Sequence, residues 1–463
     1  MHVQRQIRLP VSPEVAFPYL ADLSNIFEWD PNVHEAGRVD LGPIGVGSRF
    51  RLLYRLGPAT LPLDYELVAM EPGRLLVFEG RGERVRLTDR LHLSTDYDGT
   101  QLTYEAQVEP RPARGATVLG AAGLGAAALR PFMERVADRV ARRLTEVFGP
   151  ATAADDATDA GLSLANLAWR FTTPGWNAAR SRYRATPRTA PGFRVVITGV
   201  TSGLGRSAAW TLAGKGCDLV LVGRSRTRLD QVASELVEAG APGQLEVRVC
   251  DLEDLDAVRA LGGALSTDAR PIHALINNAG ALHDEARTIA GLERSTVVDA
   301  VAPALLARRL RQRLGYTGGC VVNVVSGGLY GVRLDVGALV EPPRPFSGVN
   351  AYAQAKRALL LETTRLDAAW AASGVRVHAM HPGWADTPGV RSSLPRFYKV
   401  TRPLLRPPFA GIDTAVWLAL TNPAPGGRLW FDRRPAPEHL LTRTRESDDD
   451  RARLADLFDR ACD

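Results

Sequence analysis

At residues 198–205 the chain reads Thr198-Gly199-Val200-Thr201-Ser202-Gly203-Leu204-Gly205, directly after an apolar run that is predicted to form a strand. Glycine permits a tight turn there and lets backbone N–H groups approach a bound phosphate closely. The N-terminus of a following helix would favour that negative charge. Because the stretch joins the first strand to the first helix of an alternating series, it predicts a dinucleotide-binding turn.

Short apolar runs alternate with helical stretches from residue 193 onward. The runs are residues 194–198, 219–222, 245–249, 274–276 and 321–325. Strands that are apolar on both faces are typical of a parallel sheet covered by helices on each side. The pattern predicts an α/β Rossmann fold with a doubly wound parallel sheet.

Residues 1–149 follow a different pattern. Apolar and polar residues alternate at 49–54 and 101–108, and a helical period of apolar residues then runs from Met133 to Val147. These signals predict an α+β domain, in which an antiparallel sheet packs against a terminal helix. Since 463 residues exceed one ordinary core, we expect a domain at 1–149, a linker and docking helix at 150–191, and a second domain at 192–463.

The predicted connection between the domains has two parts. Residues 151–160 are small and acidic, which suits a linker. Leu162 to Trp176 regains apolar and aromatic residues, so we expect it to dock as a helix on the C-terminal domain.

The net charge of +6 is mildly basic for this length. An arginine cluster at Arg308, Arg309, Arg311 and Arg313 lacks the interleaved aromatic residues that stack on nucleic-acid bases. A solvated basic face is therefore favoured over an anionic partner surface, and we expect no nucleic-acid partner.

The cysteines and the apolar segments bear on the compartment. Cys217, Cys250, Cys320 and Cys462 show neither short-range pairing nor metal-ligand spacing, and no signal-type apolar core follows Met1. We therefore expect a cytoplasmic protein without a metal site. The uncharged stretch 115–129 is short for a transmembrane span; we expect it to begin a buried helix, with membrane insertion as the alternative.

One helical turn separates Tyr352 from Lys356 in Tyr352-Ala353-Gln354-Ala355-Lys356. Lys356 is one of only 3 lysines, against 54 arginines. On a helix both side chains project from the same face, where the ammonium should lower the pKa of the tyrosine. Arginine is poorly suited to relaying a proton because its pKa is very high. The spacing indicates an acid/base pair, and coincidental spacing is the alternative.

The ordered motifs of the C-terminal domain resemble the short-chain dehydrogenase/reductase (SDR) family. Besides the glycine turn and Tyr352 to Lys356, they are Asn277-Asn278-Ala279-Gly280, Ser326 after the fifth strand, and His381 to Thr387 after the sixth. Residues 326–328, 352–357, 380–390 and 427–433 are similar to the member-12 subgroup of that family. The resemblance implies an oxidoreductase that interconverts a carbonyl and an alcohol with a nicotinamide cofactor.

Catalytic roles follow from the same resemblance. Tyr352 would be the general acid in reduction and the general base in oxidation, Lys356 would tune its pKa and hold the nicotinamide ribose, and Ser326 would hydrogen-bond the carbonyl. The family's fourth catalytic residue is an asparagine, and our alignment places Asp299 there. Its charge would alter the coupled titration of Tyr352 and Lys356. A register error in this helix is the alternative explanation.

The resemblance also implies which residues bind the cofactor. No acidic residue ends the second strand to bond the ribose hydroxyls of NAD; Arg224 stands there, with Arg206 or Arg226 as helpers, and suits a 2′-phosphate. We therefore favour NADP over NAD, with a turn-capping arginine as the alternative. The candidate cofactor-binding residues are Gly199, Ser202, Gly203, Leu204, Gly205, Arg224, Asp251, Leu252, Asn278, Ala279, Gly280, Tyr352, Lys356, Pro382, Gly383 and Thr387.

The N-terminal region resembles the polyketide cyclase and START-like (SRPBCC) superfamily, whose members have a helix-grip fold. The similar stretches are residues 11–17, 25–31, 45–48 and 71–75. The resemblance implies a curved sheet around a long helix, enclosing an apolar cavity used mainly for hydrophobic ligands. No paired carboxylates or nucleophile in the sequence commit this domain to chemistry.

The substrate is predicted only by class. A proline-rich insertion between Ser326 and Tyr352, together with Trp384, favours a small hydrophobic carbonyl or alcohol, and the insertion is either a lid or a rigid surface loop. We expect an NADP-dependent reductase whose fused domain binds the ligand. The alternatives are a ligand-binding protein that senses nucleotide without turnover and a bifunctional cyclase/reductase. SDR proteins commonly form homo-oligomers through the helices after the fourth and fifth strands, which the fused domain could block.

Overall fold

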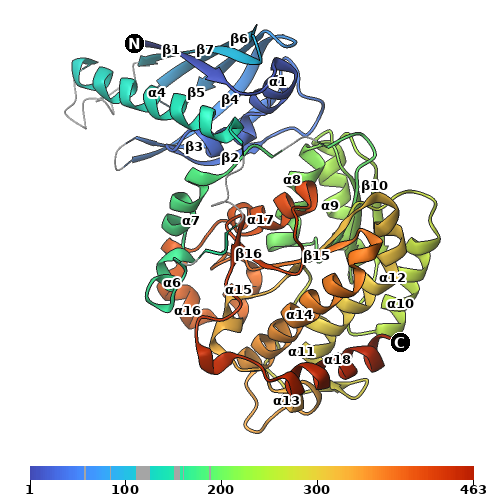
Figure 1. Ribbon diagram of the computed structural model, residues 1–463. Coiled ribbons are helices and arrows are strands. Elements are labelled where there is room, and N and C mark those ends of the chain that lie inside the picture. Colours follow the sequence, from blue (N-terminus) through green and yellow to red (C-terminus); the bar gives the residue numbers. More distant parts are fainter. Residues whose placement is uncertain (57–58, 84, 111–125, 151–156, 160, 187–188) are drawn as a thin grey trace. The chain divides into compact units, whose positions relative to one another are not determined.

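The computed structural model describes residues 1–56, 59–83, 85–110, 126–150, 157–159, 161–186 and 189–463, which form two compact units (Figure 1). The N-terminal unit comprises Met1–Thr152, Asn177–Arg188 and Ala239–Pro242. The C-terminal unit comprises Ala153–Trp176, Thr189–Glu238 and Gly243–Asp463. Most of the predicted linker at 151–160, and residues 115–125 of the uncharged stretch, lie outside the described residues.

The N-terminal unit contains a seven-stranded antiparallel sheet in the order β1-β7-β6-β5-β4-β3-β2. Its strands are β1 (His2–Leu9), β2 (Val33–Arg38), β3 (Arg49–Leu56), β4 (Ala59–Glu71), β5 (Leu75–Arg81), β6 (Val85–Asp96) and β7 (Gly99–Pro110). The short helices α1 (Pro13–Ala21) and α2 (Ile26–Trp29) lie between β1 and β2. Side chains of one face alternate into the core, as at Leu63, Tyr65 and Leu67 of β4.

Helix α4 (Ala126–Phe148) closes the core of this unit and lies across the sheet (Figure 1). Val136, Val140, Leu144 and Val147 are buried, which confirms the predicted helical period. The predicted helix-grip arrangement of a sheet on a long helix is thereby confirmed.

The C-terminal unit has an eight-stranded sheet in the order β10-β9-β8-β11-β14-β15-β16-β17. The strands are β8 (Arg194–Thr198), β9 (Asp218–Gly223), β10 (Leu245–Val249), β11 (Ala274–Asn277), β14 (Cys320–Val324), β15 (Arg376–Met380), β16 (Leu429–Phe431) and β17 (Arg434–Ala436). All neighbours are parallel except β16 and β17. The predicted doubly wound sheet is confirmed, and its strand order reverses beside β8.

Helices pack on both faces of this sheet. Helices α8 (Gly203–Gly214), α9 (Arg226–Glu238) and α17 (Pro408–Thr421) lie together, as do α10 (Leu255–Thr267), α12 (Ala302–Thr317), α14 (Gly348–Trp370) and α18 (Asp448–Cys462). α18 packs on α12 and α14, the helices after the fourth and fifth strands, so the chain itself covers part of the surface through which oligomers were predicted to form. The short helices α13 (Val336–Val340), α15 (Pro388–Ser393) and α16 (Pro395–Thr401) connect these elements.

The arginine cluster on α12 is engaged within the unit. Arg308 bonds Glu362 and Asp459, Arg311 lies over the Trp370 ring, and Arg313 donates to the Ser266 carbonyl. These contacts count against an anionic partner surface, and they differ from the predicted solvated basic face because the guanidinium groups bond within the unit. Among the residues that the structure describes, no helix is long and apolar enough to cross a membrane.

Candidate active site

The predicted site residues gather where the parallel strands end at the reversal of strand order. The glycine turn follows β8, Asn278 follows β11, Ser326 follows β14 and Pro382 follows β15. Crevices at the carboxyl ends of such strands are where doubly wound folds bind their ligands.

The glycine turn requires residues without side chains. Gly199 has φ +73°, and a Cβ on it would lie 2.8 Å from the Ala279 Cα. A Cβ on Gly205 would collide with the Asn278 side chain and the Gly199 carbonyl. The Asn278 Nδ2 donates to the carbonyl oxygens of Thr198 at 2.9 Å and Gly199 at 3.2 Å, so β11 fixes the shape of the turn.

The N-terminus of α8 opens from this turn. Ser202 is its extended N-cap residue and is exposed, and Gly203 and Leu204 are half-buried. A Cβ on Gly203 would lie 3.3 Å from the Thr387 side chain, so the glycine turn lies directly against the loop after β15. Backbone N–H groups at a helix start and a close backbone cradle fit the pyrophosphate of a dinucleotide.

The residues predicted to meet the adenosine half lie at neighbouring strand ends. Leu252 is buried and Asp251 is exposed, with its Oδ1 accepting from the Glu253 N–H at 3.1 Å. Arg224 is exposed and has no hydrogen bond or ion pair with the described residues. The proposed helpers are occupied, because Arg206 pairs with Glu235 and Arg226 with Asp230.

Lys356 and Asp299 form a buried ion pair. The Lys356 Nζ lies 3.2 Å from the Asp299 Oδ1, which also accepts from the Ala281 N–H at 3.3 Å. Asp299 lies on a π-helical turn, Val297–Val301, that directs it into this position. Gly280 permits the approach, since a Cβ there would lie 2.5 Å from the Asp299 Oδ1. The aspartate predicted from alignment is therefore in contact with the predicted lysine.

The electrostatics of Tyr352 differ from the sequence-based expectation. Burial, and secondly the charge of Asp299, raise the pKa of Tyr352, so the net direction is opposite to the expected lowering. The Lys356 ammonium lies 5.5 Å from the Tyr352 ring centroid and is neutralised by Asp299. Burial raises the pKa of Asp299 itself to about 6, against the opposing effect of Lys356.

Ser326 lies beside the start of α14. Its Oγ accepts from the Gly328 N–H at 3.3 Å, and a Cβ on Gly328 would lie 3.6 Å from that Oγ and 3.8 Å from the Ala353 Cβ. Ser326 and Tyr352 are both half-buried, and no described residue hydrogen-bonds the Tyr352 hydroxyl. Both hydroxyls are thus available to an incoming oxygen atom.

The loop after β15 carries Pro382, Gly383 and Thr387. Gly383 has φ +70°, and Thr387 caps α15 by accepting from the Val390 N–H. Sequence reasoning missed the residue that supports this loop: the Phe171 carbonyl accepts from the Trp384 N–H at 2.9 Å. The aromatic residues of the predicted docking segment were the signal that could have identified it.

The insertion between Ser326 and Tyr352 is largely packed. Its apolar residues Leu334, Val336 and Leu339 belong to the hydrophobic core. This packing favours the rigid alternative over an apolar lid. The proline-rich part, residues 341–346, is exposed or half-buried.

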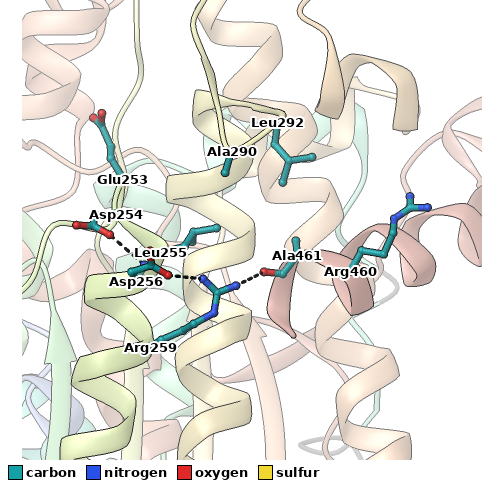
Figure 2. Close-up of a pocket in the computed structure, with 9 residues that line it drawn as sticks. All are labelled: Glu253, Asp254, Leu255, Asp256, Arg259, Ala290, Leu292, Arg460 and Ala461. Atoms are coloured by element: carbon teal, nitrogen blue, oxygen red, sulfur yellow. Dashed lines mark hydrogen bonds and ion pairs between the residues drawn. The ribbon is translucent and has the colours of Figure 1, made fainter.

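A pocket of about 490 Å³ lies away from these residues, at the N-terminal end of α10 (Figure 2). Its charged side chains are already engaged: Arg259 bonds Asp256 and the Ala461 carbonyl, Asp254 caps α10, and Glu253 and Arg460 pair with Arg294 and Asp456. It contains none of the candidate site residues. In the part of the chain that the structure describes, no group of histidine, cysteine and acidic side chains could hold a metal ion.

Comparisons with known proteins agree with this geometry. Residues 194–396 match the family model described as short chain dehydrogenase, and residues 1–145 match the model described as polyketide cyclase / dehydrase and lipid transport. Dehydrogenase/reductase SDR family member 12 from Homo sapiens is 32% identical over 56% of this chain and 82% of its own length. A proposed daunorubicin C-13 ketoreductase from Streptomyces sp. (strain C5) is 35% identical over 53% and 85%. Retinol dehydrogenase 12 from Homo sapiens is 30% identical over 50% and 74%.

The similarity to these relatives and the Rossmann fold lead to one assignment. The C-terminal part supplies the oxidoreductase fold, and the N-terminal part supplies a polyketide cyclase/START-like domain. The chain belongs to the short-chain dehydrogenase/reductase family and is an oxidoreductase that acts on CH–OH and C=O groups.

Proposed function

We propose that this chain is an NADP(H)-dependent enzyme that interconverts a carbonyl and a secondary alcohol on a hydrophobic substrate. The observation that carries the proposal is a pair of hydroxyls whose protons no described residue accepts, that of Ser326, which only accepts from the Gly328 N–H, and that of Tyr352. The ring of Tyr352 lies 5.5 Å from the ammonium of the buried Lys356–Asp299 pair. A dinucleotide cradle lies at the same strand ends.

The proposed mechanism assigns each side chain one task. The nicotinamide cofactor, when bound, supplies or accepts the hydride. Ser326 donates a hydrogen bond to the carbonyl oxygen and stabilises its developing charge. Tyr352 gives its proton to that oxygen in reduction and takes it back in oxidation.

Lys356 and Asp299 complete the proposed relay behind Tyr352. Lys356 binds the cofactor's ribose and keeps a positive charge below the tyrosine, while Asp299 holds its ammonium in place. With a pKa of about 6, Asp299 can exchange a proton near neutral pH.

The preference for NADP rests on Arg224. Arg224 directly follows β9, is exposed and makes no ion pair with the described residues, and its guanidinium suits a phosphate geometrically. The hydrophobic substrate class is supported by the half-buried Trp384, which packs on Phe397 with ring centroids 5.1 Å apart, and by relatives named for retinol and daunorubicin.

The direct test is an assay of the full chain with NADPH against apolar aldehydes and ketones, including retinal and an aryl methyl ketone. We expect NADPH oxidation with at least one member, and a weaker rate with NADH. The absence of turnover across the panel, with NADPH still bound, would favour the nucleotide-sensing alternative.

A second candidate function concerns the N-terminal domain and is favoured by a polar cluster on the inward face of its sheet. The Asp89 carboxylate accepts from the hydroxyls of Tyr65 and Tyr104, each at 3.0 Å. Gly80 makes room for Tyr65, because a Cβ there would lie 2.5 Å from the tyrosine Cζ. Burial raises the pKa of Asp89 to about 6, as it does that of Asp30 nearby.

Such a carboxyl suits a binding or proton-accepting role toward the polar end of an apolar ligand. We propose that the domain binds the substrate and holds it near the reductase. The alternative is that the domain also catalyses a cyclisation, with Asp89 as the proton acceptor. Incubating the full chain with an aryl 1,3,5-triketone in the absence of NADPH distinguishes the two alternatives. Formation of a cyclised product indicates cyclase activity, and saturable binding without product indicates ligand binding alone. Asp89→Asn should weaken either result, and an unchanged result would exclude Asp89.

The proposed location is the cytoplasm. All four cysteines are buried free thiols, and burial raises the pKa of Cys217 and Cys250 to about 11. Inert thiols of this kind fit a reducing compartment.

A further inference from the structure

Phe171 lies in the connecting segment, upstream of residue 194 where the dehydrogenase family model begins. It ends helix α6 (Leu164–Arg170) and is 2% exposed. Its ring lies 4.9 Å from His381, 5.3 Å from Phe431 and 6.0 Å from Trp384, measured between ring centroids. A residue from outside the matched region thus packs against the loop that follows β15 and against Phe431 at the end of β16.

The ring of Phe171 fills the space beside Gly327, the residue directly after Ser326. A Cβ on Gly327 would collide with Cε2 and Cζ of that ring. The Phe171 ring therefore occupies the space that a side chain at residue 327 would need. The turn that carries the Ser326 hydroxyl packs against this ring.

The backbone of Phe171 supports the other loop. Its carbonyl accepts from the Trp384 N–H at 2.9 Å and from the Arg406 Nε at 3.0 Å. A Cβ on Gly383 would lie 2.9 Å from the same oxygen. Arg406 is held by Asp432 at 2.6 Å, so this acceptor is part of a buried network.

The segment around Phe171 is anchored on the rest of the C-terminal unit at several points. The Arg170 carbonyl accepts from the Arg406 guanidinium at 2.5 Å, and the Thr173 hydroxyl donates to the Leu405 carbonyl at 2.7 Å. Trp176, in helix α7 (Thr173–Ala179), is fully buried with its ring centroid 5.5 Å from that of Phe409. These contacts hold Phe171 in a fixed position.

We infer that Phe171 is a positioning residue of the reductase, which sets the Ser326 turn through its ring and the Pro382–Trp384 loop through its carbonyl. The connecting segment is then part of the catalytic unit in addition to joining two domains. The inference rests on the proposed function, since it assigns Phe171 to the geometry of the Ser326 hydroxyl and of the Pro382–Trp384 loop.

The test compares Phe171→Ala with Leu162→Ala in the full chain. Both residues are buried in the same core cluster and segment, but Leu162 supplies neither the ring that faces Gly327 nor the carbonyl that accepts from the Trp384 N–H. Because a small displacement of the reacting groups slows a reaction strongly, Phe171→Ala should lower kcat by roughly 10-fold to 100-fold. The kcat of Leu162→Ala should stay within about 3-fold of the wild-type value. Amide exchange should accelerate at 326–331 and 382–387 in Phe171→Ala alone.

A compensating pair separates positioning from general stability. Gly327→Ala should lower kcat because its methyl group meets the Phe171 ring, and adding Phe171→Leu should recover part of that loss. Equal kcat losses in the Phe171 and Leu162 variants, uniform acceleration of exchange, or no recovery in the double variant would each overturn the inference. If the wild type shows no turnover, the proposed function fails, but the exchange data still test the contacts of Phe171.

Discussion

The Lys356 Nζ lies 3.2 Å from the Asp299 Oδ1, and both side chains are buried beneath Tyr352. A carboxylate in this position offsets the ammonium that the tyrosine–lysine spacing alone would predict to act on the phenol. The charge state of Asp299 therefore affects the pH at which Tyr352 gains or loses its proton.

Asp299→Asn should move the pH dependence of the reaction. The Asp299 charge raises the pKa of Tyr352, so removing it lowers that pKa. Reduction needs protonated Tyr352, so the alkaline limb of the pH profile of kcat for reduction should shift to lower pH by roughly 1 unit. The pH optimum for alcohol oxidation should shift in the same direction. Profiles of kcat against pH in both directions measure the shift. Identical profiles for variant and wild type would show that Asp299 does not act on Tyr352.

Lys356→Arg should lower kcat by roughly 100-fold or more, although the charge is kept. A planar guanidinium does not fit the site of a buried ammonium held at 3.2 Å and does not release a proton readily. The matched control is Lys399→Arg at an exposed position, which should leave kcat within about 2-fold. A fully active Lys356→Arg enzyme would argue that only the charge matters.

Arg224→Ala should raise the KM for NADPH by roughly 10-fold and leave the KM for NADH nearly unchanged, because the exposed guanidinium would bond only the 2′-phosphate. Arg226→Ala is the control, since Arg226 already pairs with Asp230. Steady-state kinetics with both cofactors decide the matter, and a parallel rise in both KM values would assign Arg224 to the turn instead.

Gly205→Ala should abolish dinucleotide binding, because the added methyl group has no room between the Asn278 side chain and the Gly199 carbonyl. Gly263→Ala, in α10 with nothing within 4 Å of its Cβ position, should leave binding intact and stabilise the helix by about 1 kcal/mol. NADPH fluorescence titration and thermal melts of both variants provide the comparison. Normal binding by Gly205→Ala would place the cofactor elsewhere.

Motifs tied to local geometry could be predicted from the sequence. The glycine turn, the apolar strands and the period from Met133 to Val147 depend on backbone rules and burial patterns, which act over a few residues. The placement of Asp299 near Lys356 was expected only from alignment. Their direct pairing depends on the π-helical turn at Val297–Val301, which no local sequence pattern predicted.

Long-range packing accounts for what the sequence did not predict. Phe171 lies far along the chain from Gly327, and only the folded unit brings them together. Asp89, Tyr65 and Tyr104 come from three strands, so their convergence depends on sheet order and register. The apolar residues of the insertion looked available for substrate, but tertiary packing buries them in the core.

The most direct test of the central claim is the rate of NADPH oxidation by Tyr352→Phe, measured with a carbonyl compound that the wild type reduces. Phenylalanine keeps the ring and removes only the hydroxyl that no described residue engages. The account predicts that kcat falls by roughly 100-fold or more while the Kd for NADPH stays within about 3-fold. A variant that reduces the same carbonyl at the wild-type rate would contradict the assignment of Tyr352 as the proton donor.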